Sequence, residues 1–265
     1  MPPAEVIRSR SNPLYKRLAA LKERAEGELC LLEGPKLVEE ALDAGLALRE
    51  AIAGPKAEAR RGALLALLRA RGVPIRILDE ALVASLSDAD TSQGLVAIAE
   101  RPQADEARLY AGTALILVAV AIQNPGNLGA LLRTAEAAGA TGAYLTSGCA
   151  DPYSWKALRG SMGSAFRLPV VGGLSLDDAL RRLRERQLAV IAAAPDAAQN
   201  YDAFDWRRGV ALLLGNEGAG LPPEAAHAAD ARVRIPMART VESLNVSAAA
   251  AVLLFEAARQ RRRAT

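Results

Sequence analysis

Residues 114–139 read ALILVAVAIQNPGNLGALLRTAEAAG and contain the clearest structural signal in the chain. Ala114–Ile122 is an unbroken apolar run, which is typical of a strand buried on both faces, as in a parallel sheet. A polar loop at 123–127 leads into a helical pattern over Leu128–Ala138, which Gly139 ends. Because another extended segment follows at Gly142–Thr146, this order predicts a β-α-β unit within an α/β domain.

The same alternation continues to the end of the chain. We predict a helix at Leu176–Arg186, strands at Leu188–Ala194 and Val210–Leu214, and a long final helix at Val246–Arg262. Upstream, the polar segment Glu100–Gly112 carries a proline and has no clear period, so it predicts a linker. We therefore expect two domains, residues 1–105 and residues 106–265.

The chain before the linker predicts a small α/β domain of its own. Helical spacing places Leu14, Leu18 and Leu21 on one face and Leu37, Val38, Ala41 and Leu42 on another. The predicted strands are Leu29–Leu32, Arg49–Ala53, Pro74–Leu78 and Gly94–Ala99. Glycines between these segments mark the turns.

The composition of the 265 residues excludes several classes of protein. Apolar residues make up 51% of the chain, which is enough to bury a core, and charged residues make up an ordinary 24%. Its longest apolar run is far shorter than the roughly 20 residues that span a bilayer, and the N-terminus lacks an apolar signal core, so we expect a cytoplasmic protein. With two cysteines and one histidine, neither a disulfide framework nor a Cys/His zinc cluster is expected.

Both ends of the chain are basic, although the net charge is only +3. Near the N-terminus, the candidate RNA-binding residues are Arg8, Arg10, Lys16, Arg17 and Lys22, and the chain closes with Arg259, Arg261, Arg262 and Arg263. Such clusters are either solvated helix faces and a disordered tail or sites that bind a phosphate backbone. The sequence alone leaves both interpretations open.

Three short clusters lie where predicted strands end. The first, NPGNLG at 124–129, is followed by Arg133. The second, LGNEGAGLP at 214–222, has glycines that permit positive φ and a close approach of a ligand to the main chain. The third runs from IPM at 235–237 to SLNVS at 243–247, where the final helix begins.

Each cluster also has a purely structural interpretation. Asn127 can cap the helix that follows, and Ser243 or Asn245 can cap the final helix. Arg133 can be an ordinary exposed arginine. Likewise, the glycine cluster can be a tight turn that binds nothing.

Together, however, the clusters resemble the motifs of the SpoU, or TrmH-like, branch of the SPOUT RNA methyltransferases. The matching segments are NPGNLGALLRTAEAAGA, LLLGNEGAGLP and IPMARTVESLNVSAAAAV, and the resemblance extends from Ala114 to about Arg259. SRSNPLYKRLAAL and LLEGPKLVEEALDAG resemble the RNA-binding module, similar to small ribosomal proteins, that often precedes this domain. One departure is the strand before the first loop, where many members carry an acidic residue and this chain has Ala119, Ala121 and Gln123.

The resemblance implies a trefoil knot formed by the C-terminal segment and a pocket for S-adenosylmethionine. The implied cofactor-binding residues are Leu214, Gly215, Asn216, Gly218, Gly220, Ile235, Met237, Ser243, Leu244 and Val246. It further implies that Arg133 is the catalytic arginine, with Asn127 as its partner in the loop and Glu217 as the organiser of the second loop. Ser243 and Asn245 are expected to face the reacting ribose.

The implied reaction is methyl transfer to a ribose 2′-hydroxyl of structured RNA, with 23S ribosomal RNA as the expected substrate. No metal is required, and base methylation through a thiol would have only Cys149 to use. The family generally forms homodimers through the final helix, whose Ala248–Ala251 stretch offers small residues for close packing.

Three alternatives remain at this stage. A Rossmann-type dinucleotide enzyme would share the strand-loop-helix order, but the loop has Gly126 and Gly129 without the G-x-G-x-x-G spacing, and the strand ending at Thr146 lacks the acidic residue that binds a ribose. A catalytically inactive RNA-binding protein of the same fold is the second. A transfer RNA methyltransferase is the third, disfavoured because those enzymes usually carry basic helical extensions instead of this first domain.

Overall fold

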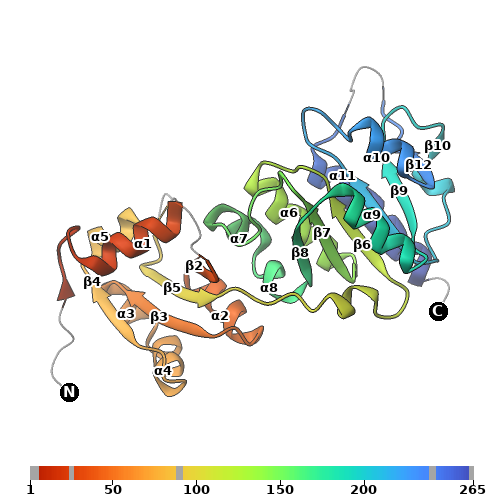
Figure 1. The fold of residues 1–265 in the computed structure, drawn as a ribbon. Helices are drawn as coiled ribbons and strands as arrows, with labels where there is room; N and C mark the ends of the chain where they lie inside the picture. The colour runs from red at the N-terminus through yellow and green to blue at the C-terminus, as the bar shows by residue number, and fades with distance from the viewer. Residues whose placement is uncertain (1–5, 24–26, 88–91, 239–242, 263–265) are drawn as a thin grey trace. The chain divides into compact units, whose positions relative to one another are not determined.

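The computed structural model describes residues 6–23, 27–87, 92–238 and 243–262. The chain divides into two compact units (Figure 1). Residues 1–102 and Tyr153–Phe166 form the first unit, whereas Gln103–Pro152 and Arg167–Thr265 form the second. The domain boundary between residues 105 and 106 stays a prediction, and the sequence did not indicate that Tyr153–Phe166 returns to the first unit.

The first unit is built on a mixed five-stranded sheet with the order β1-β4-β3-β5-β2. Its elements are β1 (Val6–Ile7), α1 (Pro13–Glu23), β2 (Leu29–Glu33), α2 (Pro35–Asp43), β3 (Leu48–Ala53), α3 (Pro55–Arg60), α4 (Gly62–Ala70), β4 (Ile75–Leu78), α5 (Glu80–Ser85), β5 (Leu95–Glu100) and α7 (Trp155–Ser161). All four strands predicted here are present, with ends shifted by one residue at most. A small α/β domain is therefore confirmed.

Helix α7 completes the core of the first unit although it comes after β7 in the sequence. Trp155 is 4% exposed and belongs to the same buried cluster as Leu31 and Ile98. The ammonium of Lys22 lies 5.6 Å from the centre of the Trp155 ring, and the Arg159 Nε lies 3.8 Å from a carboxylate oxygen of Glu33. The first core thus depends on a segment from the second half of the chain.

The second unit contains a seven-stranded sheet in which every neighbouring pair is parallel, in the order β10-β12-β9-β11-β6-β7-β8. Its elements are η1 (Glu106–Tyr110), β6 (Leu115–Ala119), α6 (Pro125–Ala137), β7 (Gly142–Thr146), β8 (Val170–Leu174), α9 (Leu176–Glu185), β9 (Ala189–Ala193), β10 (Gln199–Asn200), η2 (Tyr201–Ala203), β11 (Val210–Leu214), α10 (Pro223–Ala228), β12 (Ala231–Arg234) and α11 (Val246–Arg262), and α8 (Ser164–Arg167) leads back into it. From β6 the chain adds β7 and β8 toward one edge of the sheet, whereas β9, β12 and β10 lie on the other side, beyond β11. Ligands of open parallel sheets bind at such a reversal, beyond the carboxyl ends of the strands.

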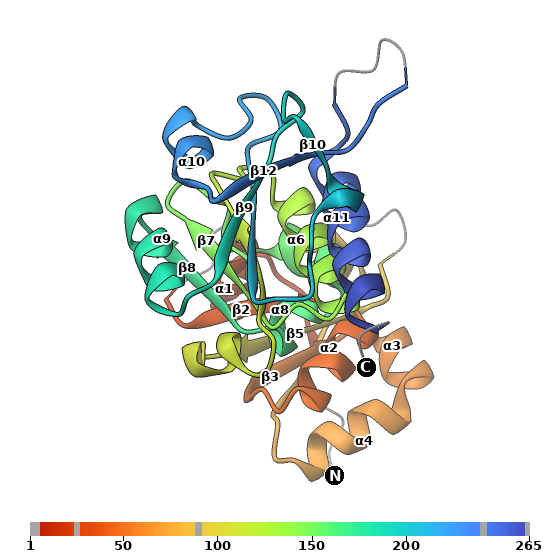
Figure 2. The ribbon, with the colours of Figure 1, turned by 90° about the vertical axis from the view of Figure 1, so that its right-hand side faces the viewer.

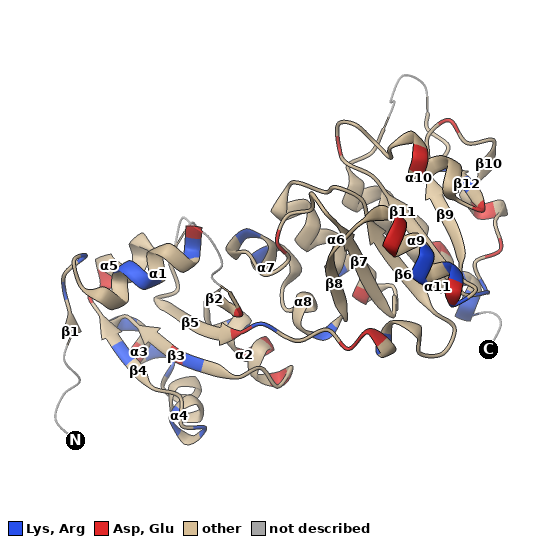
Figure 3. Cartoon of the chain, viewed as in Figure 1, with Lys and Arg blue, Asp and Glu red and all other residues tan. Residues whose placement is uncertain are grey.

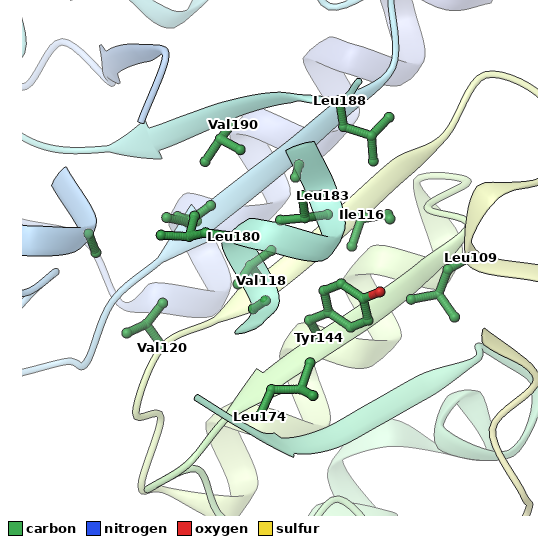
Figure 4. Close-up of a cluster of buried hydrophobic side chains, with 14 of the residues drawn as sticks. Leu109, Ile116, Val118, Val120, Tyr144, Leu174, Leu180, Leu183, Leu188 and Val190 are labelled. Carbon is green, nitrogen blue, oxygen red and sulfur yellow. The ribbon is translucent and has the colours of Figure 1, made fainter. Parts of the chain in front are cut away.

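Helices cover both faces of this sheet. In Figure 2, α9 and α10 lie on one side, and α6 and α11 lie together on the other. Because strand side chains alternate, Ile116, Val118 and Tyr144 pack beneath Leu180 and Leu183 of α9, as Figure 4 shows. Their neighbours in β6 face the opposite way, so the strand is buried on both faces as its composition predicts.

The predicted linker is partly ordered against the second unit. Residues 106–110 form the 3-10 helix η1, whose Leu109 is fully buried. The phenol of Tyr144 donates to Glu106 Oε1 at 2.6 Å and is also hydrogen-bonded to the hydroxyl of Tyr110, while Arg182 Nη1 donates to Glu106 Oε2 at 2.7 Å. Burial, followed by the bond to Glu106, raises the pKa of the Tyr144 phenol. Part of the segment predicted as a linker therefore forms a short helix that packs within the second unit.

Two boundaries near the first cluster differ from the prediction. Strand β6 ends at Ala119, before the predicted Ile122, because Ala121 adopts a left-handed conformation with φ of 52°. Helix α6 begins at Pro125, since the side chain of Asn124 caps it by accepting from the N–H groups of Gly126 and Asn127. The suggestion that Asn127 caps this helix was therefore wrong, and its side chain is available for other contacts.

Helix α11 spans Val246–Arg262, as predicted to the residue. Of the two candidate caps, Asn245 takes the role, because its Oδ1 accepts from the N–H of Ser247 at 2.9 Å. Residues 239–242, which belong to the third motif and to the segment that the implied knot would thread, lie outside the described ranges. In the parts of the chain that are described, no helix has the length and apolar character needed to cross a membrane.

Candidate active site

A cavity of about 720 Å³ lies at the carboxyl ends of β9, β11 and β12. Every residue predicted to bind the cofactor lines it: Leu214, Gly215, Asn216, Gly218, Gly220, Ile235, Met237, Ser243, Leu244 and Val246. Segments more than 30 positions apart in the sequence thus meet around one space. Its volume is in the range of cofactor and small-molecule sites.

The loop after β11 is shaped by glycines and by Asn216. A Cβ on Gly215 would lie 2.3 Å from main-chain atoms of Gly220, so only glycine permits this closure. The main chains of Asn216 and Gly220 exchange hydrogen bonds of 3.0 and 2.9 Å, and Asn216 Oδ1 accepts from the N–H groups of Gly218 and Ala219. This part of the wall is therefore main chain held in a fixed turn.

The three sequence clusters are joined directly by Asn127. Its Nδ2 donates to Glu217 Oε1 at 2.7 Å, and its Oδ1 accepts from Asn245 Nδ2 at 3.3 Å. The hydroxyl of Ser247 also donates to the main-chain carbonyl of Asn127. A short polar chain thus runs from Glu217 through Asn127 to Asn245, although these residues lie 90 and 118 positions apart.

Arg133 lies on α6, six residues after Asn127 and therefore about 9 Å further along the helix axis. Its side chain is exposed. Within the described ranges, no hydrogen bond or ion pair engages its guanidinium. Neither Asn127 nor Arg133 lines the cavity itself, and the exposed Arg133 is accessible to a large ligand.

The cavity also has charged lining residues that sequence reasoning missed. Asp196 follows β9 and is paired with Arg232 of β12, and His227 belongs to α10. The bond from Arg232 lowers the pKa of the Asp196 carboxyl. Since β9 was predicted at Leu188–Ala194, its carboxyl end could have been placed at the same sheet edge as the other clusters, which is the signal that points to Asp196.

Cys149 is held in the structure as a hydrogen-bonded thiol. Its Sγ accepts from the N–H of Ile122 and donates to the carbonyl of Ala119, both at 3.3 Å. Burial raises the pKa of this thiol, so the nucleophilic thiolate is disfavoured. Among the described residues, no group of three or more His, Cys, Asp or Glu is placed to hold a metal ion.

The candidate RNA-binding residues of the first unit have different surroundings (Figure 3). Arg8, Arg10, Lys16 and Arg17 are exposed, and Arg17 lines a second cavity of about 440 Å³ together with Arg76 and Asn12. Lys22 is half-buried over Trp155. Its charge is thus partly committed to α7.

The arginines at the other end of the chain are largely structural. Arg259 forms two short bonds to the buried Glu256, and Arg261 donates to main-chain carbonyls that come just before β6 and β11. Arg263 lies outside the described residues. For Arg259 and Arg261, the structure therefore favours neither of the two interpretations of this basic end. These arginines are neither a disordered tail nor a free phosphate-binding cluster, because both bond to other parts of the protein.

Residues 114–255, which contain all three clusters, match the model of the SpoU rRNA methylase family. The chain belongs to this family. Residues 31–104 match a second model, for the substrate-binding domain of RNA 2′-O ribose methyltransferases. The resemblance inferred from the three motifs is confirmed.

Named relatives match almost the whole chain. An uncharacterised tRNA/rRNA methyltransferase of Synechocystis sp. is 35% identical over 96% of this chain and 93% of its own length. The 23S rRNA (guanosine(2553)-2′-O)-methyltransferase RlmP of Bacillus subtilis is 33% identical over 91% of this chain and 93% of its own length.

Solved structures share the fold along the full length. A crystal structure of an RNA 2′-O ribose methyltransferase superimposes with a TM-score of 0.84 at 37% identity, covering 97% of this chain and all of that one. An AdoMet-bound rRNA methyltransferase from Sinorhizobium meliloti has a TM-score of 0.81 at 32% identity, over 96% of this chain and 97% of that one. The predicted fold class, a parallel α/β domain of the SPOUT type behind a small α/β domain, is confirmed.

Proposed function

We propose that this SpoU-family protein transfers a methyl group from S-adenosylmethionine to a ribose 2′-hydroxyl of 23S ribosomal RNA. The observation that carries the proposal is the polar chain Glu217–Asn127–Asn245, which joins the three family motifs next to a cavity of cofactor size. The 2′-O-methyltransferase of B. subtilis, similar over the full length, supports the substrate. These residues also argue against an inactive RNA-binding protein.

The cavity fits a nucleoside-containing cofactor. Its wall is mainly main chain, glycine and apolar side chains such as Leu214, Ile235 and Leu244, which suit a flat adenine ring with hydrogen-bonding edges. When bound, S-adenosylmethionine supplies a methyl group activated by the sulfonium. Asp196 offers a carboxylate and Arg232 a guanidinium to the charged end of such a ligand.

The side chains near the cavity then hold the ribose in line with the methyl donor. We propose that Ser243 and Asn245 position the sugar and that Asn127, fixed by Glu217, keeps Asn245 in place. A guanidinium is a poor base, so the proposal gives Arg133 a different task. Its role in the proposal is to grip an adjacent phosphate with two N–H groups and to stabilise the negative charge that develops on the attacking oxygen.

The first unit supplies the remaining phosphate contacts in this proposal, through Arg8, Arg10, Lys16 and Arg17, with Lys22 contributing less because it packs on Trp155. We propose that the protein acts on ribosomal RNA in the cytoplasm. No step of the reaction requires a metal ion.

The purified protein is expected to bind S-adenosylmethionine in calorimetry and to transfer its labelled methyl group to 23S rRNA from a strain that lacks the protein. The modified linkage should resist alkaline cleavage, because that cleavage needs a free 2′-hydroxyl. Mapping ribose methylation in the deletion strain should show one lost mark. Label on a base, or on transfer RNA alone, would contradict the proposal.

We also propose a homodimer formed through α11. Ala248 and Phe255 lie two turns apart on the exposed side of this helix, with Val252 between them, and Phe255 is 43% exposed. The opposite side, including Ala250 and Leu254, is buried within the domain. A second copy of the same helix would cover this apolar stripe and meet small side chains at its N-terminal end.

Phe255→Glu is therefore expected to shift the protein from dimer to monomer in sedimentation velocity, because it would bury a charge in the interface. Phe255→Leu, which keeps the apolar surface, is the matched control and should remain dimeric. A wild-type protein that sediments as a monomer, or a glutamate variant that stays dimeric, would contradict this interface.

A further inference from the structure

The connection between β6 and the first motif contains a residue with a strained main chain, Ala121. Ala121 has a φ of 52°, in the left-handed region that an L-residue with a Cβ rarely occupies. It lies two residues after the last residue of β6 and three before Asn124, the cap of α6. The direction in which α6 leaves the sheet, and hence the position of Asn127 and Arg133, depends on this conformation.

Two side chains hold the peptide groups of Ala121 in place. The hydroxyl of Thr146, at the end of β7, accepts from the Ala121 N–H at 3.0 Å. On the other side, Nδ2 of Asn216 donates to the Ala121 carbonyl at 2.9 Å. Thr146 is 5% exposed and lies outside the lining of the cofactor cavity, so its contact with Ala121 is made in the interior.

Unlike Thr146, Asn216 lines the cofactor cavity. Its Oδ1 is occupied by the N–H groups of Gly218 and Ala219 in the loop that walls the cofactor cavity. One amide group therefore shapes this loop through its oxygen and fixes Ala121 through its nitrogen. The next residue, Glu217, makes a second attachment to the same neighbouring segment through Asn127.

We propose that Asn216 is a positioning residue that couples the cofactor loop to the helix carrying Asn127 and Arg133, by holding Ala121 in its left-handed conformation. The inference deepens the proposed function, on which it rests. The amide oxygen of Asn216 and one N–H of its amide nitrogen are engaged with protein groups, so its proposed contribution to methyl transfer is the alignment of donor loop and acceptor helix. Rigid attachment of this kind is what in-line attack requires.

Each substitution in the test removes one of the two contacts with Ala121. Asn216→Asp keeps the oxygen that accepts from Gly218 and Ala219 but places a carboxylate against the Ala121 carbonyl. Thr146→Val removes the second contact with no change in the cavity lining. Each is expected to lower the single-turnover rate at saturating cofactor by about 10- to 100-fold, the range for breaking a buried hydrogen bond and leaving its partner unpaired.

The decisive variant is Ala121→Gly, because glycine adopts positive φ without strain and needs no enforcement. Alone, it should leave the rate within about threefold of the parent and the melting temperature within about 3 °C, since relief of strain and greater freedom of the unfolded chain offset each other. Combined with Thr146→Val or with Asn216→Asp, it should restore most of the lost rate. Calorimetric affinity for S-adenosylmethionine should change less than the rate in the Thr146→Val variant.

Three results would overturn the inference. The first is a full rate in both single variants, and the second is a double variant as slow as its parent single variant. A loss of rate fully accounted for by weaker cofactor binding in Thr146→Val is the third. If Asn216→Asp does not fold, the comparison of Thr146→Val with and without Ala121→Gly decides alone. A wild-type protein that methylates no RNA refutes the proposed function, but the effect of Ala121→Gly on the melting temperature can still be measured.

Discussion

Replacing Arg133 by alanine is expected to lower the rate of methyl transfer by about 10²- to 10³-fold, the cost of removing a preorganised donor to a developing oxyanion. The physical reason is that its guanidinium is exposed and has no described protein partner, so it is available to RNA. It lies on α6, which packs against α11, a helix that lines the cofactor cavity. RNA affinity should fall less than tenfold, since in the proposed function Lys16, Arg17 and other cations are expected to contact other phosphates. The measurement is a single-turnover rate at saturating RNA and cofactor, with affinity determined separately.

Arg133→Lys separates charge from geometry. Lysine keeps the positive charge but cannot present two parallel N–H groups to one phosphate, so we expect a rate well below that of the parent. Arg181→Ala is the matched control, because Arg181 is also an exposed helical arginine but lies on α9, away from the site, and should stay within twofold. Nearly full turnover in Arg133→Lys with unchanged RNA affinity would refute the bidentate role.

Arg261→Ala is expected to destabilise the protein by about 2–4 kcal/mol, which corresponds to a fall in Tm of roughly 5–15 °C for a protein of this size. The guanidinium of Arg261 donates to four main-chain carbonyls, those of Trp206, Thr113, Ala114 and Arg208, at 2.7–3.0 Å. Burial lowers the pKa of this guanidinium, which still stays charged. Removing it takes one donor from each of these carbonyls at the starts of β6 and β11, although the Ala114 carbonyl keeps the N–H of Val210.

Differential scanning calorimetry checks this expectation, with Arg207→Ala as the matched control. Arg207 is an exposed arginine paired with the exposed Asp205, and surface pairs of this kind contribute less than about 1 kcal/mol. Equal melting temperatures for the two variants would show that the four bonds of Arg261 add nothing to stability. Arg261→Lys should be intermediate, because an ammonium can reach only some of the four carbonyls.

Much of the second domain could be predicted because its signals are local. Val210–Leu214 and Val246–Arg262 have the bounds that periodicity predicts, and the glycines of the loop after β11 mark a turn that a Cβ at Gly215 would block. Each motif follows a strand of one parallel sheet, so their meeting at the carboxyl edge of that sheet follows from topology once the strands are recognised.

Other features depend on contacts that no local pattern encodes. The conformation of Ala121 is imposed by Thr146 and Asn216, which lie 25 and 95 positions away, so the end of β6 could not be read from its apolar run. Similarly, His227 reaches the cavity because α10 packs against β9. The 3-10 helix at 106–110 is capped locally by Asp105, but its contacts with Tyr144 and Arg182 come from distant parts of the chain.

The burial of Trp155 among residues of β2 and β5 has a consequence for recombination between family members. A substrate-binding domain that is exchanged as one continuous gene segment ending at residue 102 would leave behind the helix that finishes its interior. Transplanting it intact requires two separate pieces, with Tyr153–Phe166 carried along. The segments that encode the substrate-binding domain and the methylase domain thus alternate along one gene, so a single crossover point cannot separate them.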